Sequence, residues 1–251
     1  MQKTQPDFFI RANWPAPKGI IAGTTTRRGG YSQAPYDSLN LGLHVGDDPS
    51  VVLQNRAELE NRLCLPNPPY WLDQVHGTNV VLAKNIAEQA PQADASYTTE
   101  PNTICAILTA DCLPVLFCSK QGDVIGAAHA GWKGLQAGVL EAVVKAMNCP
   151  LQKLMAWLGP AIGPSAYEVG PEVYQAFVKD DPKAAQAFSK GREDRYYANL
   201  YELAKQRLQA LGLNAIYTEN YCTFSDQERF FSYRREGKTG RMASLIFRAH
   251  S

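Results

Sequence analysis

Apolar residues occur along this chain mainly in short runs bounded by glycine, proline or polar residues, a pattern typical of buried strands. The pattern predicts strands at residues 18–26, 70–74, 80–83, 103–109, 114–117, 124–129, 154–158, 216–217 and 242–248. Together with helical segments between them, these strands indicate an α+β fold with mixed β-sheets and flanking helices. No internal repeat or linker interrupts the pattern, so we expect one domain over residues 1–251.

Four segments carry the spacing of amphipathic helices. They lie at residues 51–65, 135–147, 171–179 and 199–211. Asp48 and Pro49 form a start signal for the first helix, because aspartate caps a helix and proline is accepted at its first position. The preceding loop, residues 31–48, is rich in Gly, Ser and Asn, and its length is typical of a loop over a functional site.

The charge balance argues against nucleic acid or a membrane surface as a partner. With 25 basic and 24 acidic residues the net charge is +1, which favours a small-molecule substrate. The longest apolar run, residues 104–118, contains Asp111 and Pro114, and is too short and too polar to span a bilayer. The N-terminal residues do not have the pattern of a signal peptide. The sequence does not specify an oligomeric state.

The spacing of the cysteines indicates the cellular compartment in which the protein is expected. Six cysteines are scattered along the chain without a C-x-x-C pair, which is typical of buried thiols rather than a disulfide framework. Because such thiols persist in a reducing environment, we expect a cytoplasmic protein.

Two of the four histidines stand where a predicted strand runs into a glycine turn. His76 precedes Gly77, and His129 lies two residues before Gly131. Cys112 lies between them in the chain, in a polar interruption of an apolar segment. Two imidazoles and a thiolate suit Zn²⁺, and three protein ligands leave a fourth position for water or substrate, as in catalytic sites.

The same residues also fit a structural interpretation, in which both histidines are hydrogen-bonded core residues and Cys112 is a buried thiol. Asp111 fits either a carboxylate that supports or performs acid–base chemistry, or a turn residue. His44 either lines the site from the long loop or hydrogen-bonds within that loop. His250, beside the C-terminus, is expected to fray.

Taken together, six segments of the chain resemble the YfiH family. They are residues 23–30, 38–47, 74–77, 109–114, 128–132 and 158–163. Their order matches the family, and the resemblance spans nearly the whole chain. The family was long labelled as laccase-domain or multicopper polyphenol oxidase proteins, and was later described as purine nucleoside phosphorylases with nucleoside deaminase activity.

The resemblance implies a metal site and a reaction. The family's two metal-binding histidines and one cysteine correspond to His76, Cys112 and His129, with zinc, or else copper, as the metal. The implied fold is similar to that of a group described as cysteine hydrolases. The implied substrates are adenosine, inosine or 5′-methylthioadenosine with phosphate, giving free base and ribose 1-phosphate, together with adenosine deamination. Some bacterial members are described instead as peptidoglycan editing factors.

A phosphorylase needs an anion site as well as a metal. Lys133, just before the second predicted helix, is one candidate, because a helix N-terminus binds phosphate. Arg27 is another, since a guanidinium can bind phosphate through two hydrogen bonds. Asn40 is assigned to the same substrate or phosphate site, and Asp111 to the catalytic residues. Lys133 also fits a solvated surface charge, and Arg27 a turn cap.

Other interpretations use the same residues. Trp132 and Tyr167 are candidates to stack on a purine, although a core role fits each equally. A cysteine hydrolase would use Cys112 as nucleophile and His129 as base. A four-copper oxidase needs on the order of ten histidines, and this chain has four, so such an oxidase is excluded. Copper at the His and Cys ligands would leave only weak polyphenol oxidation as an alternative. A non-catalytic binding module explains the fold but not a ligand set with an open position.

Overall fold

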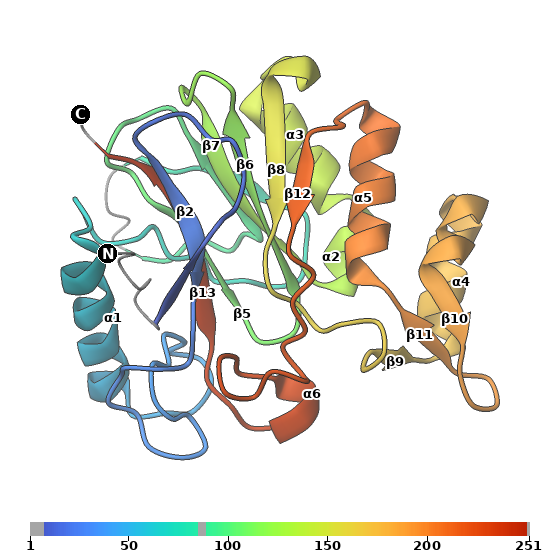
Figure 1. The fold of residues 1–251 in the computed structure, drawn as a ribbon, viewed down its shortest axis with the longest axis horizontal. Coiled ribbons are helices and arrows are strands. Elements are labelled where there is room, and N and C mark those ends of the chain that lie inside the picture. Colours follow the sequence, from blue (N-terminus) through green and yellow to red (C-terminus); the bar gives the residue numbers. More distant parts are fainter. Residues whose placement is uncertain (1–7, 85–88, 250–251) are drawn as a thin grey trace, which may run out of the picture.

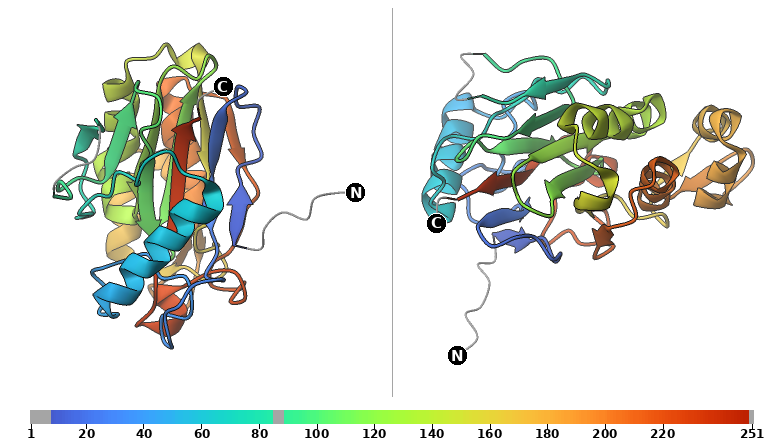
Figure 2. Two further views of the ribbon diagram at one scale, coloured as in Figure 1. Left: turned by 90° about the vertical axis from the view of Figure 1, so that its left-hand side faces the viewer. Right: turned by 90° about the horizontal axis from the view of Figure 1, so that it is seen from above.

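The structure is a computed structural model that describes residues 8–84 and 89–249 of the 251-residue chain. Two β-sheets pack face to face, and helices lie against their outer faces (Figures 1 and 2). The predicted mixture of β-sheets with flanking helices is confirmed. The single domain predicted over residues 1–251 remains a prediction, and His250 lies outside the described residues.

The larger sheet is mixed, with the strand order β12-β8-β6-β7-β4-β3. Its strands are β3 (Val80–Leu82), β4 (Ala95–Thr98), β6 (Leu113–Ser119), β7 (Ile125–Ala130), β8 (Leu154–Leu158) and β12 (Ile216–Thr218). Every residue of β6, β7 and β8 is buried. A strand covered on both faces has no polar face to maintain, which is why these strands are continuous apolar runs in the sequence.

The smaller sheet is antiparallel, with the order β1-β2-β13-β5. Its strands are β1 (Phe9–Arg11), β2 (Ile20–Thr25), β5 (Cys105–Thr109) and β13 (Met242–Arg248). Helix α1 (Pro49–Leu63) covers its outer face, where Leu59 packs in one apolar cluster with Leu245 and Phe247. Asp48 caps this helix and Pro49 begins it, as predicted.

The two sheets share a core. Ile107 and Ile246 of the smaller sheet pack in one cluster with Leu116 and Trp157 of the larger sheet, and all four side chains are fully buried. Burying each such side chain stabilises the fold by about 1.5–3 kcal/mol. The sandwich therefore holds the ends of both sheets in a fixed relation, and the candidate site lies at those ends.

Helices cover the other face of the larger sheet. They are α2 (Trp132–Ala137), α3 (Val139–Met147) and α5 (Leu200–Leu211). Val143 of α3 and Leu208 of α5 pack in one cluster with Phe117 of β6. In the described part of the chain, no helix has both the length and the apolar character needed to cross a bilayer.

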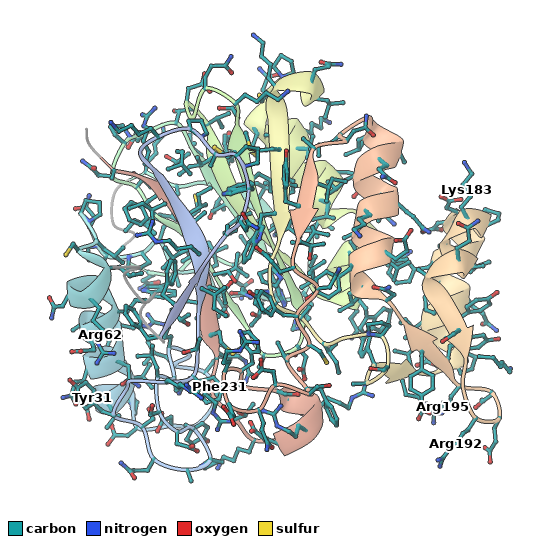
Figure 3. The ribbon with its side chains drawn as sticks, in the orientation of Figure 1. Tyr31, Arg62, Lys183, Arg192, Arg195 and Phe231 are labelled. Atoms are coloured by element: carbon teal, nitrogen blue, oxygen red, sulfur yellow. The ribbon has the colours of Figure 1, made fainter. Side chains whose placement is uncertain are left out.

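A small lobe extends beyond α5 (Figure 1). It contains α4 (Pro171–Asp180), the 3₁₀ helix η2 (Pro182–Ala187) and a three-stranded sheet of β9 (Glu168–Val169), β10 (Phe188–Lys190) and β11 (Tyr196–Ala198). The remaining helices are the 3₁₀ helix η1 (Leu151–Lys153) and the one-turn helix α6 (Tyr233–Glu236). At the tip of the small lobe, Arg192 and Arg195 point outward (Figure 3).

Two predicted elements are wrong in detail. The helix expected over residues 135–147 is two helices, because Gly138 has φ +101° and caps the end of α2 and the start of α3. The strand expected over residues 70–74 forms only isolated bridges, from Tyr70 to Cys105 and from Asp73 to Gln92. The short strands β1 and β4 and the sheet of the small lobe had no prediction, since two to four residues carry little periodicity.

Candidate metal centre and its pocket

The structure brings His76, Cys112 and His129 together at one end of the sandwich. One ligand atom of each side chain lies within 4.8 Å of the others. The rings of His76 and His129 meet edge to face, with centroids 4.7 Å apart, and the Cys112 Sγ lies 4.0 Å from the His76 Nε2. His129 is buried, Cys112 is intermediate and His76 is exposed, so the cluster opens on one side. The geometry makes these residues a candidate metal centre.

Cys112 reaches the cluster because the chain changes sheets there. Strand β5 belongs to the smaller sheet and β6 to the larger, and residues 110–112 connect them. Asp111 has φ +92°, an unusual backbone conformation for a residue other than glycine. In the antiparallel register of β6 and β7, Pro114 is opposite His129 and Leu113 is opposite Ala130. This register brings the start of β6, with Cys112, beside the end of β7, with His129.

Asp94, a residue without a predicted role, organises the two histidines. Its Oδ1 lies 2.8 Å from the His129 Nδ1, and its main-chain oxygen accepts a hydrogen bond from the His129 N–H at 2.7 Å. Its carboxylate also accepts from the main-chain N–H groups of residues 75–77, at 2.6–3.2 Å. The bond to Nδ1 leaves the Nε2 of His129 as its ligand atom, the usual role of a carboxylate behind a metal-binding histidine.

The same carboxylate fixes the loop that carries His76. His76 has φ +62°, a left-handed conformation that costs energy for a residue with a side chain. The three N–H groups bound to Asp94 stabilise the loop in this conformation. Although burial raises the pKa of Asp94, hydrogen bonds from His129 and Gly77 hold it below its ordinary value. The carboxylate is therefore ionised at neutral pH.

The donor set fits a metal ion, and the surroundings of Gly131 show how closely the three side chains approach one another. A Cβ added to Gly131 would lie 3.0 Å from the His76 Cδ2, 3.1 Å from the Cys112 Sγ and 3.5 Å from the His129 Cε1. All three side chains thus converge over a residue that has no side chain of its own. A cluster of two imidazoles and one thiolate open on one side matches a three-ligand site.

The charges in the cluster favour the thiolate form of Cys112. Burial raises the pKa of the Cys112 thiol, but the positive charge of His129 and hydrogen bonds from both histidines lower it to about 6. Conversely, burial lowers the pKa of His129, whereas the Cys112 thiolate and the Asp94 hydrogen bond raise it to about 9. The two groups stabilise each other's charged forms. A metal ion binds a thiolate and a neutral imidazole, so its binding would displace the Nε2 proton of His129.

The open side of the cluster faces a pocket of about 360 Å³, within the size range of small-molecule sites. Its lining residues are His44, Gln74, His76, Leu108, Thr109, Ala110, Cys112, His129, Tyr233 and Arg241. Of these, Arg241 carries a guanidinium, and Tyr233 is a large aromatic side chain left 59% exposed. The pocket therefore combines the candidate metal centre with a positive charge and an accessible ring.

Asp111 is not among the residues that line this pocket. Its carboxylate accepts hydrogen bonds from the Thr223 hydroxyl at 2.6 Å, the Ser232 hydroxyl at 3.0 Å and the Arg234 N–H at 2.7 Å. These contacts tie residues 223–234, and through them α6 with Tyr233, to the loop that carries Cys112. The catalytic role assigned to Asp111 remains a prediction, and its contacts favour a positioning role.

The residues assigned to the phosphate site do not line the pocket. Arg27 donates to Glu236 at 2.8 Å and to the main-chain oxygen of Asp37 at 2.8 Å. Lys133 is exposed on α2 and lies over the Trp132 ring at 5.8 Å. Asn40 is fully buried, and its amide bonds the main chain of Gly42, the Asp47 carboxylate and the N–H of Arg241. Their assignment to substrate or phosphate binding stays a prediction.

The structure favours the core role for the two aromatic candidates named from the sequence. Trp132 and Tyr167 both pack against the core under the larger sheet, and the Arg234 guanidinium lies over the Tyr167 ring at 5.3 Å. The ring in the pocket belongs to Tyr233, and His44 lines the pocket, one of the two roles considered for it. Sequence reasoning missed Asp94, Tyr233 and Arg241. The one signal for Asp94 is an acid among the small residues 93–96.

Comparisons with known proteins agree with the geometry. A family model described as multi-copper polyphenol oxidoreductase laccase matches residues 21–249. The purine nucleoside phosphorylase YfiH of Escherichia coli is 51% identical over 239 residues, covering 95% of this chain and 98% of that protein.

Solved structures give the same result. A crystal structure of a Neisseria meningitidis protein superposes with a TM-score of 0.94 at 46% identity, covering 97% of this chain and 100% of that one. The crystal structure of YlmD from Geobacillus stearothermophilus gives a TM-score of 0.92 at 32% identity, covering 99% and 98%. The similarity in sequence and in structure thus extends over nearly the whole chain.

Proposed function

The chain belongs to the YfiH family, and we propose that it is a metal-dependent purine nucleoside phosphorylase. The reaction splits adenosine, inosine or 5′-methylthioadenosine with phosphate into free base and a ribose 1-phosphate. The observation that carries this proposal is the pocket in which His76, Cys112 and His129 converge, in a chain about half identical to a curated phosphorylase. A small-molecule nucleoside and phosphate are then its partners.

Zinc is the metal we propose for the three side chains, with copper as the alternative. His129 and His76 each offer an imidazole nitrogen, and Cys112 offers a thiolate. This mixture of ligands is common in zinc sites with an open fourth position. These three residues would hold the zinc ion, which would supply a Lewis acid for an oxygen or nitrogen of the substrate.

The chain's own residues would orient the nucleoside. Tyr233 offers an exposed ring for stacking on a purine at the mouth of the pocket. Asp94 holds His129 and the His76 loop rigidly, so that little reorganisation is needed when the substrate binds. Phosphorolysis then requires a phosphate oxygen to form a bond to C1′ as the bond from C1′ to the purine nitrogen breaks.

Adenosine deamination is a second activity that we propose for the same pocket. It adds water to the purine C6 and releases ammonia, and activated water is the usual nucleophile at open zinc sites. The exposure of His76 on the pocket side supports this proposal, because water has access to the cluster there. Inosine formed from adenosine without phosphate is the expected product.

A cysteine hydrolase acting in peptidoglycan editing is the alternative from a different class. The specific observation in its favour is the order Cys112, His129 and Asp94, which resembles a nucleophile, its base and the group that orients the base. A metal ion on Cys112 would remove the nucleophile. Amide hydrolysis by metal-free protein, abolished by alkylating Cys112, would favour this alternative over the phosphorylase.

We do not propose a laccase, in spite of the description of the matching family model. The chain has four histidines, and a four-copper oxidase needs on the order of ten. Copper in the three-ligand cluster would support at most weak oxidation of polyphenols. A cytoplasmic location fits the proposed substrates and the six cysteines, all of which are free thiols.

The test is product analysis of adenosine incubated with purified, zinc-loaded protein, with and without phosphate. We expect adenine and ribose 1-phosphate only when phosphate is present. Cys112→Ala should abolish this activity, whereas Cys64→Ala, a matched change at an exposed thiol, should retain it. No turnover of any purine nucleoside by the metal-loaded protein would refute the proposal.

A further inference from the structure

Arg241 lies on the pocket wall without an ion pair among the described residues. Its Nη1 donates to the main-chain oxygens of Thr239 and Gly240, both at 3.0 Å. Within residues 8–84 and 89–249, no carboxylate oxygen lies within 4.0 Å of its guanidinium, in contrast to Arg27, Arg207 and Arg229. Burial lowers the pKa of Arg241 from its ordinary value, although attraction to the nearby Cys112 and Asp111 opposes that shift. A half-buried cation that no carboxylate contacts is costly, and a bound anion would offset that cost.

Thr109 adds a second donor to the same wall. The residue is only 2% exposed and lines the pocket, yet its buried hydroxyl has no hydrogen-bond partner among the described residues. Buried hydroxyls nearly always have a partner. In the register of β5 and β13, Thr109 is opposite Met242, the residue after Arg241. Thr109 at the end of β5 and Arg241 just before β13 therefore lie at the same end of one sheet, and both line the pocket.

The long loop holds Arg241 in place. The Asn40 Oδ1 accepts the Arg241 N–H at 2.9 Å, and the Leu41 N–H donates to the Arg241 main-chain oxygen at 3.2 Å. A Cβ on Gly42 would lie 2.8 Å from the Arg241 Cγ, so the absence of a side chain at Gly42 lets the loop pack against the arginine stem. These contacts make Asn40 and Gly42 positioning residues for the cation.

We propose that Arg241 and the Thr109 hydroxyl bind the phosphate cosubstrate, a subsite that rests on the proposed phosphorylase function. A tetrahedral oxyanion accepts two parallel hydrogen bonds from the free edge of a guanidinium and one from a hydroxyl. Bound there, hydrogen phosphate shares one pocket with the candidate metal centre. Its oxygen forms the bond to C1′, the electron pair of the broken bond goes to the purine nitrogen, and the phosphate proton ends on the purine.

The kinetic test compares Arg241→Met, Arg241→Lys and Thr109→Val with the wild type in phosphorolysis. Arg241→Met should raise KM for phosphate about 10- to 100-fold, because hydrogen bonds to a charged group are lost. Lysine keeps the charge but not the paired geometry, and should restore part of the loss. Thr109→Val keeps the shape of the side chain and should raise KM for phosphate about 3- to 10-fold. KM for the nucleoside should change far less in all three.

Two controls distinguish binding from folding. Arg192→Met removes an equivalent charge at the tip of the small lobe and should leave KM for phosphate unchanged (Figure 3). Thr109→Val removes a hydroxyl that has no internal partner, so it should fold with wild-type thermal stability even if Arg241→Met does not. The proposal would be overturned if KM for phosphate stays unchanged both in Thr109→Val and in folded Arg241→Met. If Arg241→Met does not fold, Gly42→Ala replaces it in this comparison.

Calorimetric titration of the zinc-loaded proteins with inorganic phosphate separates this subsite from the proposed function. Phosphate binding that is weakened in Arg241→Met supports the subsite even if no nucleoside is cleaved, in which case only the phosphorylase proposal fails. Phosphorolysis with equal phosphate affinity in wild type and Arg241→Met would refute the subsite and leave the phosphorylase proposal intact.

Discussion

Two pockets lined by arginines have nearly equal volumes but differ in their charge pairing. The pocket beside Arg27 and Arg28 has a volume of about 340 Å³, and the pocket at the candidate metal centre about 360 Å³. In the first, Arg27 pairs with Glu236 at 2.8 Å and Arg28 with Glu228 at 3.0 Å. In the second, Arg241 has no carboxylate within 4.0 Å among the described residues. Paired charges stabilise a fold, whereas charges and donors left unpaired at a pocket are available to a ligand.

The largest effect is expected from Asp94→Asn, which breaks the metal pocket. Asparagine keeps one acceptor oxygen where the carboxylate serves His129 and three N–H groups of the His76 loop. Loss of such a supporting group typically weakens metal affinity about 10- to 100-fold. Competition with a chromophoric chelator measures the zinc affinity. Asp194→Asn, a change at an exposed carboxylate in the small lobe, should have no effect, and an equal loss in both variants would contradict the role of Asp94.

Gly131→Ala tests whether convergence of the three ligands depends on the absence of a side chain. The added Cβ would meet the ligand side chains at 3.0–3.5 Å and push them apart. Overpacking of this kind costs about 1–3 kcal/mol, here at the expense of zinc binding. The chelator assay gives the affinity, and thermal unfolding of the metal-free protein shows whether the fold is intact. Zinc affinity equal to that of the wild type would show that the cluster tolerates a wider separation.

Arg27→Met sharpens the comparison between the two pockets. Removing the guanidinium breaks the bonds to Glu236 and Asp37 and its contact with the Phe231 ring, 4.8 Å away. We expect the free energy of unfolding to fall by about 1–2 kcal/mol, measured in urea. KM for phosphate should rise less than in Arg241→Met. A larger rise in KM for Arg27→Met would instead favour the phosphate role that the sequence predicted for Arg27.

Glu236→Gln gives the smallest effect, a change in the pH dependence of stability. Burial raises the pKa of Glu236, but hydrogen bonds from Thr239, Arg235 and Arg27 bring it below the ordinary value of 4.5. A depressed pKa in the folded state means that the stabilisation is complete above pH 4.5 and is lost as the pH falls through the folded value. Urea unfolding should show the wild type losing its advantage over Glu236→Gln in acid. A constant difference at all pH values would show that the ion pair makes no contribution.

The contrast between His129 and Arg27 shows how far local patterns reach. His129 belongs to a buried strand ending at a glycine turn, and its neighbours in the chain predict both the strand and a place at its end. Arg27 is equally conspicuous in the sequence, but its partner Glu236 lies 209 residues away. A pattern within a few residues cannot indicate which charge meets which across such a separation. The resemblance to a family, which carries information about the whole fold, supplied the metal ligands.

The sequence by itself determined the mixed α and β class and most of the strands and helices, because apolar periodicity, capping residues and glycine turns act over a few positions. It indicated the three residues of the candidate metal centre through the resemblance to a family, not through their spacing. Only the tertiary structure decided that Asp94 supports both histidines, that Arg27 is neutralised and that Arg241 is not. Those outcomes depend on strand register and on a connection between two sheets, which bring together charges that are distant in the chain.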